Sequence, residues 1–309
     1  MCFKSKSLSG PTSHNYFSQR LRLNYVDWGN ADAPPMVLIH GGLDHCRSWD
    51  WVAERFKKDY HIIAPDLRGH GDSDWMIGGA YNQLDYLYDI AQLLHQKDLG
   101  PVSIIGHSMG GAISLMYAAI YPQAVEKLVV IEGLGLSPNS EARRAKKPSS
   151  NRIRKWITDL RNSSGRSARR YSSLSEAMLR MRDKNPHLSE EQARHLTIYG
   201  SNQNEDGSFT WKFDNYVRFF EFTGRPANET WKLWGDIVCP TLLVYGTESW
   251  ASDPISDGRT SHFNCPLEVE VFENAGHWVH HDQLEGFVKR ADSFLISEVT
   301  KDQSGKFDN

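Results

Sequence analysis

Runs of apolar residues recur along the chain, and most are followed by a segment with apolar residues at helical spacing. The clearest is Val102 to Gly106, after which Ala112, Leu115, Met116 and Ala119 recur at helical spacing. Comparable strand-like runs are Met36 to Gly42, His61 to Asp66, Val125 to Gly133, Cys239 to Trp250 and Leu267 to Trp278. This alternation predicts the α/β class, with a mostly parallel central sheet between flanking helices. Two segments of period two within Tyr16 to Val26 predict edge strands.

The alternation stops between residues 134 and 236, where the pattern is helical and shows no buried strand run. We therefore expect a first core part over residues 1–133, a helical cap over 134–236 and a second core part over 237–309. Within the cap, residues 139–170 hold eleven Lys or Arg against two acids. A solvated helical face is the favoured interpretation of this charge, and attraction of anionic substrates or of a membrane surface is the alternative.

Composition narrows the class of protein. Of the 309 residues, 39% are hydrophobic and 11% aromatic, which suits a globular protein with a sizeable core. A net charge of -3 argues against a nucleic-acid partner. No apolar run approaches a membrane span, and the first residues lack the apolar stretch of a signal peptide, so we expect neither secretion nor stable membrane insertion. Four scattered cysteines favour a reducing, cytoplasmic location, and a homodimer is compatible with the sequence.

The motif Gly-His-Ser-Met-Gly stands where the strand from Val102 turns into the next helix. A serine at the tip of such a turn holds strained backbone angles, so small residues are needed two positions before and after it. Gly106 and Gly110 meet that need. Ser108 is therefore a candidate nucleophile, and the amide of Met109 at the helix start is a candidate donor to an oxyanion.

A second oxyanion donor is expected from the glycine pair that ends the strand Met36 to Gly42. Glycines there permit backbone conformations that other residues avoid, so that an amide can face Ser108. Gly42 is the candidate, with Leu43 as the alternative. We expect His40 to hydrogen-bond beneath this loop without a catalytic role, and Asp66 with Arg68 to form a buried pair that fixes the next loop.

His277 follows the last core strand, in the segment Ala-Gly-His-Trp, and is the candidate base. Four motifs now stand in order: HGG at 40–42, DLRGHGDS at 66–73, GHSMGG at 106–111 and AGHWVHHDQ at 275–283. In this order they resemble the α/β-hydrolase family, specifically its serine hydrolases with a helical cap, such as carboxylesterases. The resemblance covers roughly residues 16–296 and is weakest across the cap.

The resemblance implies that Ser108 attacks an acyl carbonyl, that His277 moves the proton, and that an acid completes a catalytic triad, with Gly42 and Met109 forming the oxyanion hole. Epoxide hydrolases and dehalogenases of similar shape use Asp as the nucleophile, so Ser108 favours esters or related acyl bonds. No cofactor and no metal are expected, because the His and carboxylate spacing does not follow a metal-binding pattern.

The triad acid is where the sequence departs from the family. Most relatives have Asp three residues after the glycine that ends the strand corresponding to LLVYG, and Ser249 stands there. Glu132, which closes the strand after the nucleophile helix, is the preferred substitute, as in a branch of the haloalkane dehalogenases. Glu248 and Asp253 are the alternatives. All three keep the chain order serine, acid, histidine.

These features predict a serine hydrolase that cleaves carboxylic esters of small to medium apolar acyl groups through an acyl-enzyme. A thioesterase, a carbon–carbon bond hydrolase or a lactonase would use the same groups, and a catalytically weak ligand-binding protein on the same scaffold is the alternative from another class. Six aromatic residues are expected either to line the substrate pocket or to form the cap's own core: Trp156, Trp211, Phe219, Phe220, Trp231 and Trp234.

Overall fold

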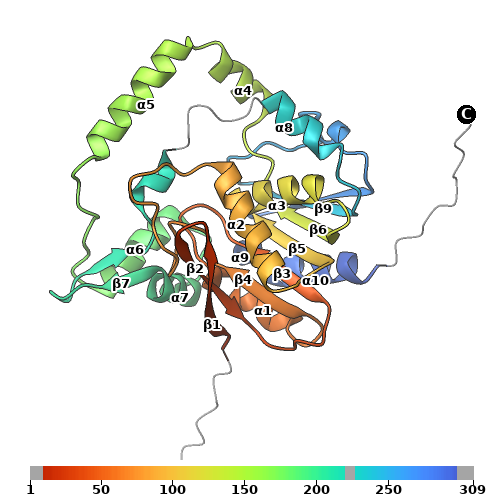
Figure 1. Ribbon diagram of the computed structural model, residues 1–309, viewed down its shortest axis with the longest axis horizontal. Helices are drawn as coiled ribbons and strands as arrows, with labels where there is room; N and C mark the ends of the chain where they lie inside the picture. The colour runs from red at the N-terminus through yellow and green to blue at the C-terminus, as the bar shows by residue number, and fades with distance from the viewer. Residues whose placement is uncertain (1–9, 220–226, 298–309) are drawn as a thin grey trace, which may run out of the picture.

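Eight strands form one sheet in the computed structural model, which describes residues 10–219 and 227–297 (Figure 1). The strands are β1 Thr12–Ser18, β2 Leu21–Asp27, β3 Pro35–Ile39, β4 His61–Pro65, β5 Val102–His107, β6 Val125–Ile131, β9 Thr241–Gly246 and β10 Leu267–Phe272. Their order in the sheet is β1-β2-β4-β3-β5-β6-β9-β10. The pairs β1–β2 and β2–β4 are antiparallel and the pairs from β4 to β10 are parallel, which confirms the predicted α/β class.

The two N-terminal strands differ in position from each other. β1 lies at the edge of the sheet, as expected, but β2 lies inside it, because residues Tyr25 to Asp27 also pair with β4. The remaining edge belongs to β10. The interior strand β5 is buried at every residue, as parallel strands covered on both faces must be.

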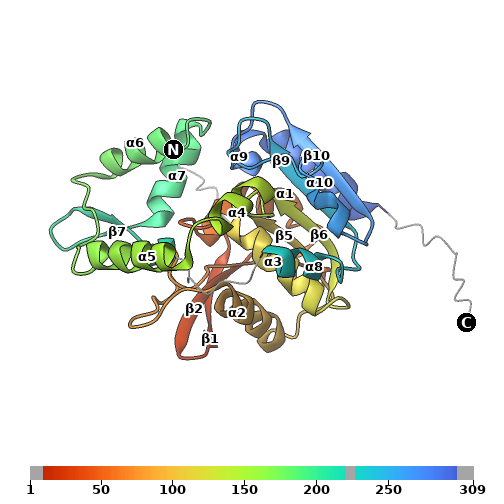
Figure 2. The same ribbon diagram turned by 90° about the horizontal axis from the view of Figure 1, so that it is seen from above.

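Helices cover both faces of the sheet (Figure 2). On one face lie α2 (Gln83–Gln96), α3 (Met109–Ile120) and α8 (Ala227–Trp234), and on the other lie α1 (Asp50–Phe56), α9 (Val279–Asp282) and α10 (Leu284–Ile296). The apolar residues of each face form a separate cluster against the strands, so the core has one layer on each face of the sheet.

The segment between β6 and β9 holds α4 (Pro138–Ala145), α5 (Ser149–Ser163), α6 (Leu174–Lys184), α7 (Glu190–Gly200) and α8. It also holds a hairpin of β7 (Ser201–Gln203) with β8 (Phe209–Trp211), which the helical pattern did not predict. Each of these strands has three residues, too few for a period of two to show. The described residues also form three short 3-10 helices: η1 Cys46–Trp49, η2 Asn215–Arg218 and η3 Arg259–His262.

The basic stretch forms α4, α5 and the loop that follows. Neither helix buries a residue, and α5 stands apart from the sheet in both views (Figures 1 and 2). Its charged residues therefore meet solvent, in agreement with a solvated face. Across residues 10–219 and 227–297, no helix combines the length and the apolar character that a membrane crossing needs.

The six aromatic residues expected in the cap serve different purposes. Trp234 is buried in the core, where its ring stacks on Phe263 at 5.2 Å, and Trp231 stacks on His262 at 5.3 Å. Trp211 lines a cavity between the insertion and the core. The remaining three lie elsewhere: Trp156 on α5, Phe219 against Tyr216, and Phe220 outside the described residues.

Candidate active site

Ser108 lies on the sharp turn between β5 and α3, with φ of 51° and ψ of -115°. The positive φ is strained for a residue with a side chain, and the turn is held by close packing around it. A Cβ at Gly110 would lie 2.2 Å from the Ile39 carbonyl oxygen, and one at Gly106 would lie 2.5 Å from the Ser114 hydroxyl. The turn therefore requires glycine on both sides of Ser108.

His277 lies in the loop between β10 and α9, and its Nε2 is 2.8 Å from the Ser108 hydroxyl oxygen. Its ring lies close to two other aromatic rings, with centroid distances of 4.8 Å to Trp250 and 4.9 Å to His107. The imidazole is in position to take the proton of Ser108 and to return it to a leaving group.

Glu132 directly follows β6 with φ of 53°, and its side chain is fully buried. One carboxylate oxygen accepts the Gly246 amide at 2.9 Å, and the other accepts the Ser249 hydroxyl at 2.8 Å. That second oxygen lies 3.4 Å from Nδ1 of His277, which is ion-pair range but long for a hydrogen bond. Such contacts in unliganded sites often shorten when substrate binds.

The two alternative acids lie elsewhere. Glu248 forms an ion pair with His187 at 3.1 Å, and half of its side chain is exposed. Asp253 accepts the amide of Ile255 at 2.9 Å within its own loop. Ser249, at the position where the family usually has Asp, contributes to the site in a way that the sequence did not predict. Its hydroxyl holds Glu132 in place.

The candidate oxyanion donors are the amides of Met109 and Gly42. Met109 is the first residue of α3, and Gly42 lies in a turn after β3. Within the described ranges, neither amide donates a hydrogen bond to a protein acceptor. We expected glycines here because they permit backbone conformations that other residues avoid, and this reason is wrong. Neither Gly41 nor Gly42 has a positive φ, whereas the next residue, Leu43, has a φ of 65°. Gly41 is needed for contact, because a Cβ there would lie 2.8 Å from the His107 ring, whereas Gly42 faces open space.

His40 stabilises this loop, as predicted. Its Nε2 accepts a hydrogen bond from the Leu67 amide at 3.0 Å. Nδ1 therefore carries the proton and donates a hydrogen bond to the Gly41 carbonyl at 2.7 Å. Burial lowers the pKa of His40 to about 3, which keeps the ring neutral. The imidazole thus joins the loops that follow β3 and β4.

The expected pair of Asp66 with Arg68 is wrong. The buried Arg68 guanidinium makes two bonds of 2.6 Å to the carboxylate of Asp89 on α2. Asp66 instead accepts the amides of Cys46 and Asp72 at 2.7 and 2.9 Å. Proximity in sequence suggested the wrong partner, because the α2 carboxylate approaches only after the helix packs on the sheet.

His107 precedes the nucleophile, and its ring is tilted by 55° to the His277 ring. Its Nε2 is 2.9 Å from the His277 carbonyl oxygen, and because a carbonyl only accepts, Nε2 carries the proton. Burial holds the pKa of His107 well below its usual range. The ring is thus a neutral support for the His277 loop. In the part of the chain that the structure describes, no group of three or more His, Cys, Asp or Glu is arranged to hold a metal ion.

The family model described as the alpha/beta hydrolase fold matches residues 34–284. The chain belongs to this family of hydrolases. Among curated proteins, Esterase Rv0045c of Mycobacterium tuberculosis is 26% identical over 290 residues, which cover 91% of this chain and 89% of that protein. Human Epoxide hydrolase 4 is 38% identical over 112 residues, which cover 36% of this chain and 31% of that protein.

Solved structures agree with this fold. A thioesterase domain from the curacin biosynthetic pathway superposes with a TM-score of 0.77 at 23% identity, over 91% of this chain and 98% of that one. The hydrolase of E-2-(acetamidomethylene)succinate superposes with a TM-score of 0.76 at 23% identity, over 93% and 100%. At 23% identity, these two structures support the fold of this chain but do not indicate its substrate.

Proposed function

We propose that the protein is a serine hydrolase that cleaves carboxylic esters of small to medium apolar acyl groups through an acyl-enzyme. The observation that carries this proposal is the 2.8 Å contact between the Ser108 hydroxyl and Nε2 of His277, with the buried Glu132 carboxylate behind the ring. A serine in this contact is the nucleophile that acyl transfer needs, and it differs from the Asp nucleophile that the resemblance associates with epoxide hydrolysis.

In the first half-reaction, Ser108 Oγ bonds to the carbonyl carbon while His277 takes the hydroxyl proton. Glu132 stabilises the imidazolium and keeps Nδ1 protonated. The Met109 and Gly42 amides, which have no protein acceptor among the described residues, donate to the oxyanion, and each such donor contributes about 100- to 1000-fold in turnover. When the carbon–oxygen bond to the leaving group breaks, His277 gives the proton to the departing alcohol.

In the second half-reaction, a water molecule attacks the acyl-serine, and His277 takes its proton. When the tetrahedral intermediate collapses, its bond to Ser108 Oγ breaks and His277 returns the proton to that oxygen. The carboxylic acid is then released. Each catalytic cycle consumes one water molecule per ester. The same three side chains act in both half-reactions.

The test is hydrolysis of p-nitrophenyl esters from acetate to dodecanoate by the wild type and Ser108→Ala, together with labelling by a fluorophosphonate. We expect turnover that is highest for the short and medium esters, and stoichiometric labelling, both lost in Ser108→Ala. Acyl thioesters of the same chain lengths serve as the comparison, and a higher kcat/KM for thioesters would replace the ester proposal. Wild-type protein that neither turns over an acyl substrate nor labels would favour a ligand-binding protein.

A further inference from the structure

A second acidic residue close to Ser108 has no role in the chemistry above. Asp44 follows the turn of Gly42 and Leu43, and only 4% of its surface is exposed. Oδ1 of its carboxyl group accepts the His45 amide at 2.9 Å. Oδ2 is buried and has no partner within hydrogen-bond geometry among the described residues; the Ser48 hydroxyl acts on the carboxyl group from nearby, but its oxygen is 2.9 Å from Nε2 of His281. An acceptor left in this state costs free energy in the folded protein, so it calls for an explanation.

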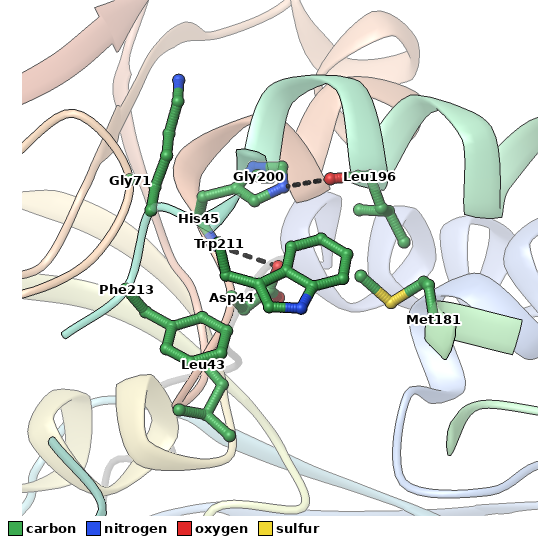
Figure 3. A pocket seen from close by; sticks show the side chains of 10 residues that line it. Leu43, Asp44, His45, Gly71, Met181, Leu196, Gly200, Trp211 and Phe213 are labelled. Atoms are coloured by element: carbon green, nitrogen blue, oxygen red, sulfur yellow. Dashed lines mark hydrogen bonds between the residues drawn. The ribbon is translucent and has the colours of Figure 1, made fainter. Parts of the chain in front are cut away.

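Asp44 lines a narrow cavity between the core and the insertion (Figure 3). Figure 3 shows Asp44 among the apolar side chains of Leu43, Met181 and Trp211. The walls come from the loops after β3 and β4, from α6 and α7, and from β8 with the two residues that follow it. The cavity has room for about one group the size of a water molecule.

The cavity is close to the candidate nucleophile. A Cβ at Gly41 would lie 3.1 Å from Cβ of Ser108, so the loop touches the nucleophile there. Asp44 is three residues further along, and three residues span at most about 11 Å. The loop therefore holds the Asp44 backbone within about 11 Å of the point where it touches Ser108.

The charged and titratable groups around the cavity leave Asp44 without a cationic partner. Lys212 lines the cavity, but its Nζ pairs with Asp72 at 2.7 Å. Nε2 of His45 donates to the Leu196 carbonyl at 3.0 Å, and burial lowers the pKa of His45, which keeps that ring neutral. The residues from α6 and α7 that line the cavity, Met181, Leu196 and Gly200, carry no charge.

We propose that Asp44 is a specificity-determining residue whose free carboxyl oxygen accepts a hydrogen bond from a hydroxyl or ammonium group of the substrate. This inference rests on the proposed ester hydrolysis and names a polar subsite within it. Burial raises the pKa of Asp44 to about 7; the His45 amide and the Ser48 hydroxyl offset part of that rise, and the Asp66 carboxylate adds to it. The acceptor is therefore ionised above neutral pH and protonated below it.

The test compares esters that carry a terminal hydroxyl or ammonium with esters that carry a methyl group at the same position, for example 6-hydroxyhexanoate and 6-aminohexanoate with heptanoate. The polar group is placed on the acyl chain in one series and on the alcohol in the other. We expect kcat/KM to favour at least one polar substrate by about 10- to 100-fold over its methyl counterpart, and this ratio to rise as pH rises through 7. The hydroxyl and ammonium members identify which donor is taken.

Three variants decide the assignment. Asp44→Ala is expected to abolish the preference, and Asp44→Asn, which keeps the size of the side chain, is expected to make it independent of pH. Glu191→Gln, at an exposed acid of α7 that does not line the cavity, should retain the wild-type ratio. Equal turnover of polar and methyl esters in both series, or a preference that survives in Asp44→Ala and stays pH-dependent in Asp44→Asn, overturns the inference. Hydrolysis of any of these esters by the wild type keeps the proposed ester hydrolysis standing, and a wild type that hydrolyses none of them refutes that function separately.

Discussion

Ser108 and Glu132 both hold a positive φ, 51° and 53°, which side chains rarely adopt. Each such conformation costs on the order of 1 kcal/mol or more, and the surrounding packing must stabilise it. Both residues stand where a strand ends, and the strained turn lifts each side chain clear of its strand. Two of the non-glycine residues with positive φ thus face His277 from opposite sides, and strained backbone of this kind is common at functional positions.

The Ser249 hydroxyl supports the first prediction. It donates one of the two hydrogen bonds that hold Glu132, and its loss leaves one carboxylate oxygen without that donor. We expect Ser249→Ala to lower kcat for a p-nitrophenyl ester by about 10-fold with little change in KM. Ser256→Ala, which removes an exposed hydroxyl bonded to Asp253, is the control. Wild-type kcat in Ser249→Ala would show that Glu132 does not depend on this bond.

At the scale of elements, the strand order explains how distant residues meet. β5, β6, β9 and β10 are consecutive neighbours in the sheet and parallel to one another. Their carboxyl ends share one edge, and the residues that follow them are Ser108, Glu132, Ser249 and His277, respectively. Open parallel sheets place their sites at this edge. The preference for Glu132 over Glu248 and Asp253 agrees with this geometry, because only Glu132 directly follows a neighbour of β5.

Periodicity predicted these elements because each strand and helix is long enough to show its period. The β7–β8 hairpin escaped prediction because its strands have three residues each. Ion-pair partners that are distant in sequence were not predicted, for a different reason. Arg68 has acids nearby in sequence, and only the packing of α2 brings Asp89 to it. The unpaired oxygen of Asp44 was likewise not predictable, because Asp44 is buried by residues of the insertion that are distant in sequence.

At the scale of the whole molecule, the protein buries many neutral histidines. Burial lowers the pKa of His40, of His70 and of His281 to about 3 each. In the unfolded chain these rings take up protons near pH 6.5, and in the folded protein they stay neutral until about pH 3. The unfolded state therefore binds more protons between those values, and the free energy of unfolding falls as the pH falls.

The ionisation of Asp44 changes the free energy of unfolding with pH in the opposite direction. Its raised pKa means that the folded protein holds a proton that the unfolded chain releases, so its contribution is present at low pH and is lost as pH rises to about 7. His45 and His107, whose pKa values burial also lowers, act in the same direction as these three histidines, so we expect a net loss in the free energy of unfolding between pH 7.5 and pH 5. Urea denaturation at both pH values measures it, and Asp44→Asn should enlarge the loss. A free energy that is unchanged or larger at pH 5 would contradict this assignment of buried neutral rings.

The central claim is that Glu132 is the acid that serves His277. The most direct measurement is kcat for p-nitrophenyl butanoate in Glu132→Gln, Glu248→Gln and Asp253→Asn, with unfolding curves to show that each variant is folded. We predict a loss of about 1000-fold or more in Glu132→Gln, because an amide no longer stabilises the imidazolium, and values within about 3-fold of wild type in the other two. Near wild-type turnover in Glu132→Gln, with a large loss in Glu248→Gln or Asp253→Asn, would contradict the account.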